Sequence, residues 1–271
     1  MPTPVALRRK VYAYYRAHGR HDLPWRLTRD PYKILVSEIM LQQTQVERVL
    51  PKYELFIKQY PNVKALAKAP LGAVLGLWVG LGYNRRAKFL HEAAKAVAAH
   101  KGKFPTTAAG LQTLPGVGPY TAGAVAAFAY NEPVSIIETN IRTVFTHHYF
   151  KEATGVSDAE IMAKVEKTLD RENPREWYYA LMDYGVYLKK TFGSNNAQSR
   201  HYTKQSKFTG SDRQIRGFII RTLTTTQKPL TLLQIAKAGQ QYEKERIRMQ
   251  LEKLQAEGMI KNEKGRSTLV T

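Results

Sequence analysis

With 271 residues, of which 42 are lysine or arginine and 22 are aspartate or glutamate, the chain carries a formal net charge of +20, which favours a polyanionic partner such as nucleic acid. The absence of cysteine excludes disulfides, cysteine-ligated zinc and iron–sulfur clusters. No apolar run is long enough to span a bilayer and the N-terminus has no signal-peptide pattern, so we expect a soluble, cytoplasmic protein.

Helical periodicity dominates the chain before residue 193, and proline and glycine separate the segments. The main apolar helical segments are residues 34–56, 71–77, 87–99, 120–129 and 177–188. Short helices joined by short turns follow from this pattern, so the sequence predicts an all-α fold for this part of the chain.

In the first of these segments, the run Ser37-Glu38-Ile39-Met40-Leu41-Gln42-Gln43-Thr44-Gln45 places a carboxylate and several amides inside an otherwise apolar helix. Glu38 follows Ile34 by four residues and precedes Leu41 by three, so it shares a face with core residues and with Gln42. Because burial raises the pKa of a carboxyl group, Glu38 is predicted to serve as a general acid near neutral pH.

A second motif, Leu114-Pro115-Gly116-Val117-Gly118, precedes an alanine-rich helix. Gly116 and Gly118 can adopt dihedrals closed to other residues, and they let a sugar-phosphate strand approach their N–H groups. The helix that follows would direct its positive end at the same phosphate. The motif therefore indicates a phosphate-binding hairpin, and an ordinary turn between helices is the alternative.

A second carboxylate, Glu138, follows a proline-containing turn at a predicted helix start, where the helix N-terminus would stabilise its anion. A simple helix cap is the alternative. Cleavage of a glycosidic bond develops positive charge on the sugar, so a proton donor and a fixed anion on opposite sides of it form a workable pair. Glu38 and Glu138 fit these two roles.

Residues 193–211 are polar and basic, which indicates a linker or a phosphate-contacting arm. Beyond them the pattern predicts helices over 212–223, 231–238 and 243–257, then a hairpin of 259–261 and 267–270. Thr231 is the expected N-cap of the second helix, and Gly258 ends the third. This order predicts a winged-helix domain over residues 211–271 that contacts DNA, and docking against the main body or another protein is the alternative.

Five motifs occur in the order seen in adenine DNA glycosylases: Leu23-Pro24-Trp25-Arg26, the run from Ser37 through Gln45 to Val46, Trp78-Val79-Gly80-Leu81-Gly82-Tyr83, the run from Leu114 to Ala124, and Ala180-Leu181-Met182-Asp183-Tyr184-Gly185. The chain thus resembles the adenine DNA glycosylase branch of the helix-hairpin-helix (HhH-GPD) DNA glycosylase superfamily. The resemblance implies a two-lobed, all-helical fold with DNA in the groove. Residues 1–27 plus 133–207 would form the counterpart of the iron–sulfur lobe, without its cluster, and residues 28–132 would form the lobe with the hairpin.

The resemblance also implies roles for single residues. Glu38 matches the catalytic acid, and Glu138 stands where the family has an aspartate that stabilises the oxocarbenium-like sugar. The base pocket would contain Arg20, Trp25, Tyr120 and Asp183. The DNA-binding set would contain Gln42 and Gln43 at the lesion, Tyr83 as a wedge, Gly116, Val117, Gly118, Asn140, and the basic residues Arg200, Lys204 and Lys207 in place of the cluster.

For cofactors, the resemblance implies no iron–sulfur cluster and no required group, with a structural Na⁺ or K⁺ held by the carbonyls of Gln112, Leu114 and Val117. Tyr120 occupies the position of the Schiff-base lysine of lyase-active relatives, and no lysine occurs between Lys103 and Lys151. A monofunctional glycosylase of base excision repair is therefore expected, acting as a monomer associated with the nucleoid.

The expected substrate is adenine opposite guanine or 8-oxoguanine in duplex DNA. Glu138 is one methylene longer than the family's aspartate. The family usually has a C-terminal pyrophosphatase-like domain that senses 8-oxoguanine, and the predicted winged-helix domain is expected in its place here. Uracil, thymine or an oxidised pyrimidine is therefore the alternative target, in duplex or single-stranded DNA. A DNA-binding protein without catalysis is the second alternative.

Overall fold

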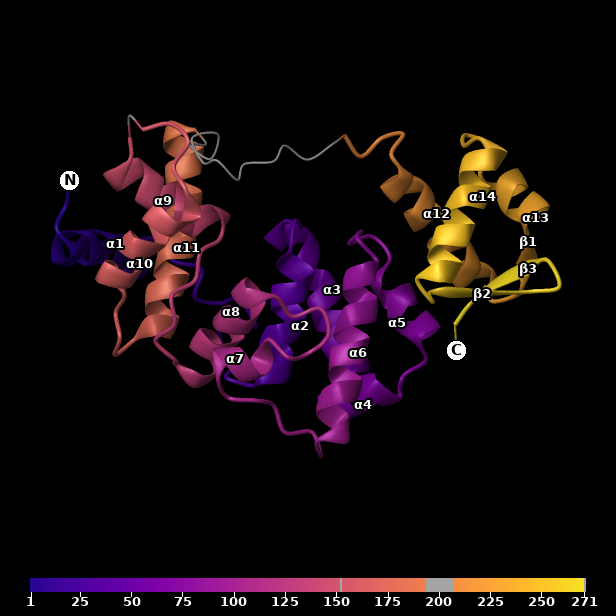
Figure 1. Ribbon diagram of the computed structural model, residues 1–271, viewed down its shortest axis with the longest axis horizontal. Coiled ribbons are helices and arrows are strands. Elements are labelled where there is room, and N and C mark those ends of the chain that lie inside the picture. Colours follow the sequence, from indigo (N-terminus) through magenta and orange to yellow (C-terminus); the bar gives the residue numbers. More distant parts are fainter. Residues whose placement is uncertain (152, 194–206, 271) are drawn as a thin grey trace. The chain divides into compact units, whose positions relative to one another are not determined.

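The computed structural model describes residues 1–151, 153–193 and 207–270 (Figure 1). By its contacts the chain divides into two compact units. The first unit consists of Met1–Glu38, Pro105–Thr113 and Val117–Lys204, and the second consists of Ile39–Phe104, Leu114–Gly116 and Gln205–Thr271. The first unit also includes part of the predicted hairpin lobe, namely residues 28–38, 105–113 and 117–132.

The first unit is entirely helical within the described residues. Its helices are α1 (Pro4–His18), most of α2 (Pro31–Leu41), α7 (Ala108–Leu111), α8 (Pro119–Tyr130), α9 (Thr139–Tyr149), α10 (Asp158–Thr168) and α11 (Pro174–Phe192). α11 packs against α9, α1 and α8, and its Trp177 and Tyr178 are fully buried. The long aromatic face of α11 therefore forms the centre of this unit's core.

A close approach of two helices positions the start of α9. A Cβ added to Gly185 of α11 would lie 2.3 Å from the backbone oxygen of Asn140, so a larger residue could not occupy this position without moving α9. Gly185 thus lets α11 pack directly against the first turn of α9, where Glu138 is the N-cap residue.

The second unit contains the remaining helices and all the strands of the described chain. Its elements are α3 (Val46–Gln59), α4 (Val63–Lys68), α5 (Leu71–Trp78), α6 (Arg85–Ala99), α12 (Asp212–Thr226), β1 (Leu230–Thr231), α13 (Leu232–Ala238), α14 (Lys244–Ala256), β2 (Ile260–Glu263) and β3 (Arg266–Leu269). The strands form an antiparallel sheet in the order β1-β3-β2, with Ile260 paired to Leu269 and Leu230 paired to Ser267.

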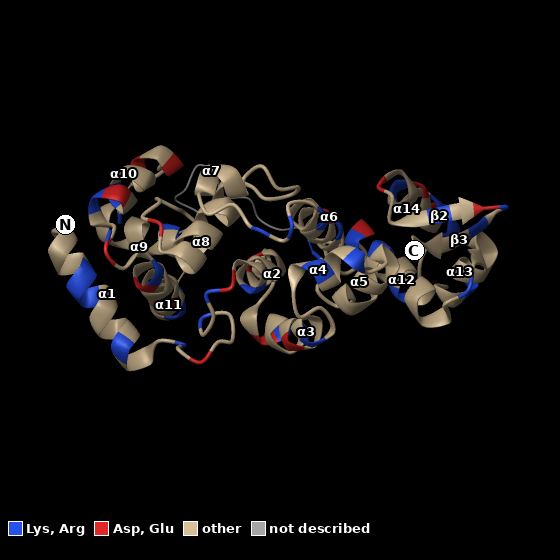
Figure 2. Cartoon of the chain, turned by 90° about the horizontal axis from the view of Figure 1, so that it is seen from below, with Lys and Arg blue, Asp and Glu red and all other residues tan. Residues whose placement is uncertain are grey.

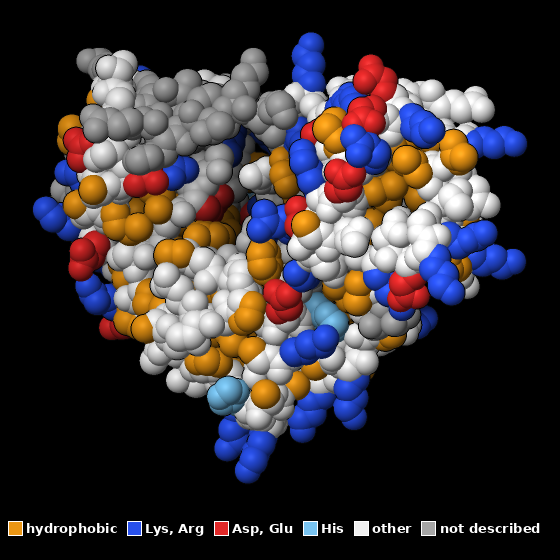
Figure 3. Space-filling model, turned by 45° about the vertical axis from the view of Figure 1, so that its right-hand side comes forward, with side chains coloured by type: hydrophobic (Ala, Val, Ile, Leu, Met, Phe, Trp, Pro, Cys, Tyr) orange, Lys and Arg blue, Asp and Glu red, His pale blue; other side chains and the backbone are white. Residues whose placement is uncertain are grey.

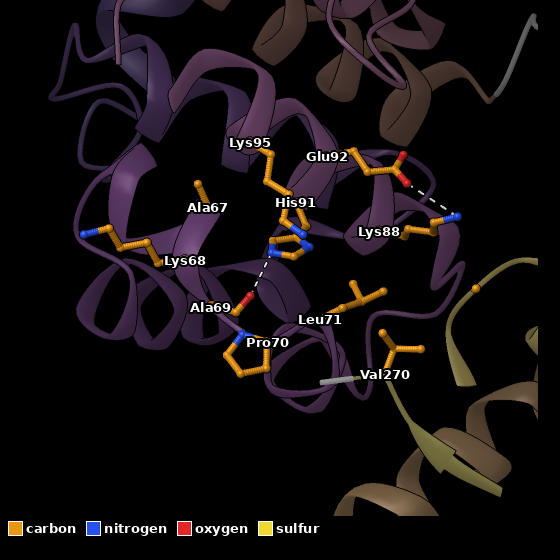
Figure 4. Close-up of a pocket in the computed structure, with 11 residues that line it drawn as sticks. Ala67, Lys68, Ala69, Pro70, Leu71, Lys88, His91, Glu92, Lys95 and Val270 are labelled. Atoms are coloured by element: carbon orange, nitrogen blue, oxygen red, sulfur yellow. Dashed lines mark hydrogen bonds and ion pairs between the residues drawn. The ribbon is translucent and has the colours of Figure 1, made fainter. Parts of the chain in front are cut away.

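The C-terminal elements dock against α5 and α6 within this unit. The amide of Gly72 donates to the carbonyl of Val270 at 2.7 Å, and the Lys88 ammonium donates to the carbonyl of Glu257 at 2.6 Å. A cavity of about 400 Å³ lies at this junction (Figure 4). In this cavity Nε2 of His91 forms a hydrogen bond with the carbonyl oxygen of Ala69 at 2.9 Å. Contacts of the C-terminal elements with α5 and α6 are thus observed, while the winged-helix assignment and DNA contact by these elements stay predictions.

The all-α prediction is confirmed for the body of the chain, and so are the C-terminal helices and the terminal hairpin. Thr231 caps α13 in a reciprocal pair with Gln234, as its sequence position indicates. The strand β1 escaped the sequence analysis because it has only two residues. Within the described ranges, no helix is both long and apolar enough to cross a membrane.

The segment of helical periodicity over residues 34–56 forms two helices. α2 ends at Leu41 and α3 begins at Val46, with Gln43 in the left-handed region at φ 55°. The buried guanidinium of Arg86 donates to the carbonyls of Ile39, Met40 and Gln42. These carbonyls therefore have a hydrogen-bond donor although the helix does not continue. A long-range partner therefore terminates a helix that its own sequence would continue.

Candidate active site

Glu38 lies in α2 with only 6% of its surface exposed, among the buried apolar residues of that helix. Burial raises the pKa of its carboxyl to about 7. The hydrogen bond from Tyr120 and the charge of Arg26 lower this pKa, and the charge of Glu138 raises it. The environment of Glu38 is thus consistent with the prediction of a carboxyl group that can act as a general acid near neutral pH.

Tyr120 stands in the first turn of α8, directly after the glycine hairpin, and its hydroxyl donates to Oε2 of Glu38 at 3.1 Å. Burial, together with the charges of Glu38 and Glu138, keeps the pKa of Tyr120 well above its ordinary value. The tyrosine is therefore a neutral donor that holds the Glu38 carboxyl in one orientation.

Glu138 is the N-cap residue of α9. Its Oε1 accepts the backbone N–H groups of Asn140 at 2.6 Å and Ile141 at 2.7 Å, and its Oε2 accepts the Asn140 side-chain amide at 3.2 Å. Three donors thus fix both oxygens of this carboxylate. The helix-start position predicted from the sequence is confirmed, and the capping alternative describes the same contacts.

The pKa of Glu138 differs from the expectation. Burial raises it above its ordinary value, although the N–H groups of Asn140 and Ile141 and the charges of Lys189 and Arg142 lower it. The helix N-terminus does stabilise the anion as predicted from the sequence, but the loss of hydration outweighs this effect. The carboxylate is held by fixed protein dipoles instead of water.

The two acids and Tyr120 form one electrostatic group in the first unit. The charge of Glu138 raises the pKa of Glu38, and the charges of both acids raise the pKa of Tyr120. A carboxyl whose pKa is raised to about 7 therefore lies within electrostatic range of a second carboxyl group, which accepts three hydrogen bonds. This arrangement can donate a proton and stabilise a nearby cation in the same site.

Asn140, predicted among the DNA contacts, lies within this group. Its side-chain oxygen accepts from the Lys189 ammonium at 2.8 Å while its amide donates to Glu138. Lys189 was not predicted because it lies outside the motifs, in the last turn of α11, where a lysine is ordinarily a solvated side chain. The structure thus adds a cation whose charge lowers the pKa of Glu138.

Asp183 and Arg20, both predicted in the base pocket, bind each other. The buried carboxylate accepts from the Arg26 guanidinium at 2.7 and 3.0 Å, from the backbone and Nε of Arg20 at 2.9 and 2.7 Å, and from Nη2 of Arg20. Burial raises the pKa of Asp183, but the hydrogen bonds and charges of Arg26 and Arg20 have the larger, opposite effect. The pKa is therefore lowered below its ordinary value. Trp25, beside Arg26 in the chain, is 4% exposed.

The residues predicted at the lesion lie in the second unit. Gln42 and Gln43 follow the end of α2, and Gln43 is exposed. Tyr83 precedes α6 in the left-handed region at φ 48°, with the guanidinium of Arg86 5.6 Å and that of Arg213 5.2 Å from its ring centre. Arg213, from α12, also donates to the Tyr83 hydroxyl at 2.5 Å. This partner lies 130 residues away in the chain, so no local pattern in the sequence predicts it.

The glycine hairpin has two different glycines. Gly116 has φ 71°, and a Cβ there would lie 2.3 Å from the Cβ of Phe89. Both the backbone conformation and the lack of space therefore require glycine at this position. Gly118, the N-cap residue of α8, has an ordinary φ of −82°. A Cβ there would meet nothing within 4 Å among the described residues. The backbone at Gly118 is thus open on one side, and the buried Val117 anchors the turn between them.

Lysine and arginine residues occur along both units (Figure 2), and many of their side chains project from the face in Figure 3. Lys207 is exposed, whereas Arg200 and Lys204 lie outside the described residues. No cluster of three or more histidine, aspartate or glutamate side chains suited to a metal ion occurs in the part of the chain that the structure describes. The carbonyls of Gln112, Leu114 and Val117 stay a prediction as cation ligands.

Comparison with known proteins identifies relatives. Residues 36–171 match the family model described as HhH-GPD superfamily base excision DNA repair protein. An adenine DNA glycosylase of Mycolicibacterium smegmatis is 35% identical over 236 residues, which cover 80% of this chain and 80% of that protein. An adenine DNA glycosylase of Buchnera aphidicola is 36% identical over 191 residues, which cover 69% of this chain but only 54% of that protein.

The fold also has a solved counterpart. A thermostable thymine-DNA glycosylase superposes with a TM-score of 0.62 at 24% identity, covering 70% of this chain and 89% of that one. The structural match therefore shows the fold, and the sequence matches show the family.

Proposed function

The chain belongs to the HhH-GPD superfamily of base excision DNA repair proteins, and from that premise we propose that it is a DNA glycosylase that removes adenine opposite guanine or 8-oxoguanine. The observation that carries this proposal is the buried Glu38 carboxyl, held by Tyr120 and coupled electrostatically to Glu138. The adenine preference rests on the names of the relatives and on the Gln42-Gln43 pair that follows α2.

In the proposed reaction, the protonated Glu38 carboxyl gives its proton to a ring nitrogen of a base that has been flipped out of the duplex. The electron pair of the C1′–N bond then leaves with the base, and positive charge develops on the deoxyribose. Protonation makes the base a better leaving group because the base then departs as a neutral molecule instead of an anion. Glu38 becomes a carboxylate in this step.

Glu138 takes the second role as the anion that stabilises the sugar cation. The two backbone N–H groups and the Asn140 amide hold its oxygens in place, so little reorganisation is needed as the charge develops. Water then attacks C1′, and the Glu38 carboxylate accepts its proton, which restores the starting acid. The products are the free base and an abasic site.

The proposed enzyme is monofunctional. Cleavage of the strand by a lyase route requires an amine that forms a Schiff base with C1′. Tyr120 occupies the equivalent position, and its buried hydroxyl is bonded to Glu38. We therefore assign Tyr120 to orienting the acid, and we expect the abasic strand to remain intact until it is treated with alkali.

DNA binding is proposed to use the protein backbone of the hairpin at Gly116 and Gly118. Gln42, Gln43 and Tyr83 would lie at the lesion, and Lys207 would contact the sugar-phosphate backbone of the DNA. The net charge of +20 suits a polyphosphate partner. We assign Asn140 to positioning Glu138, because its side chain is bonded on both sides within the site.

Gly118→Ala is expected to weaken DNA binding by about tenfold, since the added methyl would stand between the strand and the hairpin amides. The free energy of unfolding should change by less than about 1 kcal/mol, because the N-cap backbone is unstrained and the added Cβ meets nothing among the described residues. Gly116→Ala should instead lose stability through its clash with Phe89. Anisotropy titration and urea unfolding separate the two, and wild-type affinity in Gly118→Ala would refute this role.

The rate of base excision is expected to fall as the pH rises through about 7, because Glu38 must carry its proton and its pKa is about 7. Each further pH unit should cost about tenfold. In Tyr120→Phe the decline should move to higher pH, since the lost hydrogen bond had stabilised the charged form. Single-turnover rates between about pH 5 and 9 test this. A flat profile, or one that Tyr120→Phe leaves in place, would count against the assignment.

A panel of duplexes tests the function as a whole. Each carries adenine, uracil, thymine or an oxidised pyrimidine opposite guanine, with a further duplex of adenine opposite 8-oxoguanine and matching single strands. We expect alkali-dependent cleavage at adenine only, and no cleavage without alkali. Cleavage at a pyrimidine would replace the proposed substrate, and tight binding with no base release would show a DNA-binding protein without catalysis.

A further inference from the structure

A cationic pocket of about 460 Å³ lies in the second unit, where the C-terminal elements meet α6 and the hairpin. Four arginines line it: Arg85 and Arg86 of α6, and Arg213 and Arg216 of α12. Among its lining residues that the structure describes there is no aspartate or glutamate. The pocket, which we call the arginine pocket, therefore attracts anions.

The four arginines are engaged differently. Arg86 is 8% exposed and donates to three carbonyls at the end of α2 and to two in the turn before α6, so it is part of the framework. Arg216 pairs with Glu257 at 2.5 Å, so its charge is balanced within the C-terminal domain. Arg85 is exposed, with its guanidinium 5.5 Å from the Phe89 ring centre. Arg85 and Arg213 line the pocket together with Tyr83 and Gly116, and we assign the ligand to these two arginines because of that position.

The remaining walls of the pocket indicate which anion it takes. Tyr83, Gln42 and Gly116, all assigned above to DNA contact, line the same pocket as Arg213. A strand that reaches the hairpin at Gly116 would bring its phosphates beside these arginines. A planar guanidinium suits a phosphate because it offers two parallel N–H donors.

We propose that the arginine pocket binds a backbone phosphate of the DNA through Arg213 and Arg85, so that the C-terminal domain supplies part of the DNA-binding surface of the glycosylase body. The inference rests on the proposed function, since it takes the hairpin and Tyr83 as DNA contacts. It goes beyond that function because Arg213 belongs to α12, outside the residues 36–171 that match the family model.

Arg213 also couples the domain to the predicted wedge. It donates to the Tyr83 hydroxyl at 2.5 Å and its guanidinium lies 5.2 Å from the ring centre. A phosphate bound by Arg213 would therefore fix the side chain that borders the predicted lesion. Two separate contributions follow, one from the charge of Arg213 and one from its contact with Tyr83, and the experiment separates them.

The test measures binding of an undamaged duplex by fluorescence anisotropy across about 50 to 200 mM salt. Arg213→Gln and Arg85→Gln are each expected to raise the Kd about tenfold and to reduce the salt dependence by about one phosphate contact. The matched control is Arg221→Gln, an exposed arginine of the same helix that does not line the pocket. It should leave the Kd and the salt slope close to those of the wild type.

Tyr83→Phe removes the hydroxyl that Arg213 contacts and keeps the charge. It should leave the salt slope unchanged. If Arg213→Gln matches Arg221→Gln, or changes the Kd without changing the slope, the pocket binds no phosphate and the proposal fails. Base excision is scored separately by alkaline cleavage, so a protein that binds with this pattern but releases no base would refute the proposed function and keep the pocket.

Discussion

Glu38→Gln is expected to lower the single-turnover rate of adenine excision by roughly 10² to 10⁴-fold, the usual contribution of a general acid. Glutamine keeps the size of the side chain and can still accept from Tyr120, but it cannot give up a proton. Binding should therefore persist while chemistry is lost. The measurement is a rapid-quench assay on a duplex with adenine opposite 8-oxoguanine, with enzyme in excess.

The matched control is Glu54→Gln, which makes the same chemical change at an exposed position of α3. It should excise at the wild-type rate. If Glu38→Gln kept full activity on every duplex that the wild type cleaves, Glu38 would not be the acid. A parallel loss of DNA affinity and rate would instead mean that the substitution had disturbed the fold.

Asp183→Ala is expected to lower the free energy of unfolding by about 3–5 kcal/mol, since it leaves the buried Arg26 guanidinium without its counter-ion. The side chains of Asp183 and Arg26 are 3% and 5% exposed. An uncompensated charge there cannot be rehydrated without opening the core. Urea unfolding followed by tryptophan fluorescence measures the loss.

Glu166→Gln provides the comparison, because its contact with Arg171 at 3.9 Å joins two exposed side chains. It should leave the unfolding midpoint unchanged. An equally small effect of Asp183→Ala would show that Arg26 finds another partner or water, and that Asp183 does not hold the segment around Arg20 to α11. Asp183 would then be available for the predicted base-pocket role alone.

Local patterns in the sequence are sufficient to predict the acid and the helix cap. Glu38 shares a helical face with Ile34 and Leu41, and such a face is buried wherever the helix packs, so spacing predicts the burial that raises its pKa. Glu138 lies at a helix start, where a side chain can accept free N–H groups. Both arguments use neighbours within four residues, and both positions agree with the structure.

Contacts between distant residues could not be predicted in this way. The break after Leu41 depends on Arg86, more than forty residues later, and the Tyr83 side chain meets Arg213 from another part of its unit. The net direction of the Glu138 pKa is a further case. It depends on how much water the whole fold removes, which the first turn of a helix does not reveal.

The proposed reaction depends on a Glu38 carboxyl that is still protonated near neutral pH. Carbon-13 labelling of glutamate side chains, with Glu38→Gln to assign the Glu38 signal, allows its titration to be followed by NMR in the free protein. The structure predicts a midpoint near 7 for Glu38. A midpoint near the ordinary 4.5 would contradict the account, because the group would then be a carboxylate with no proton to give.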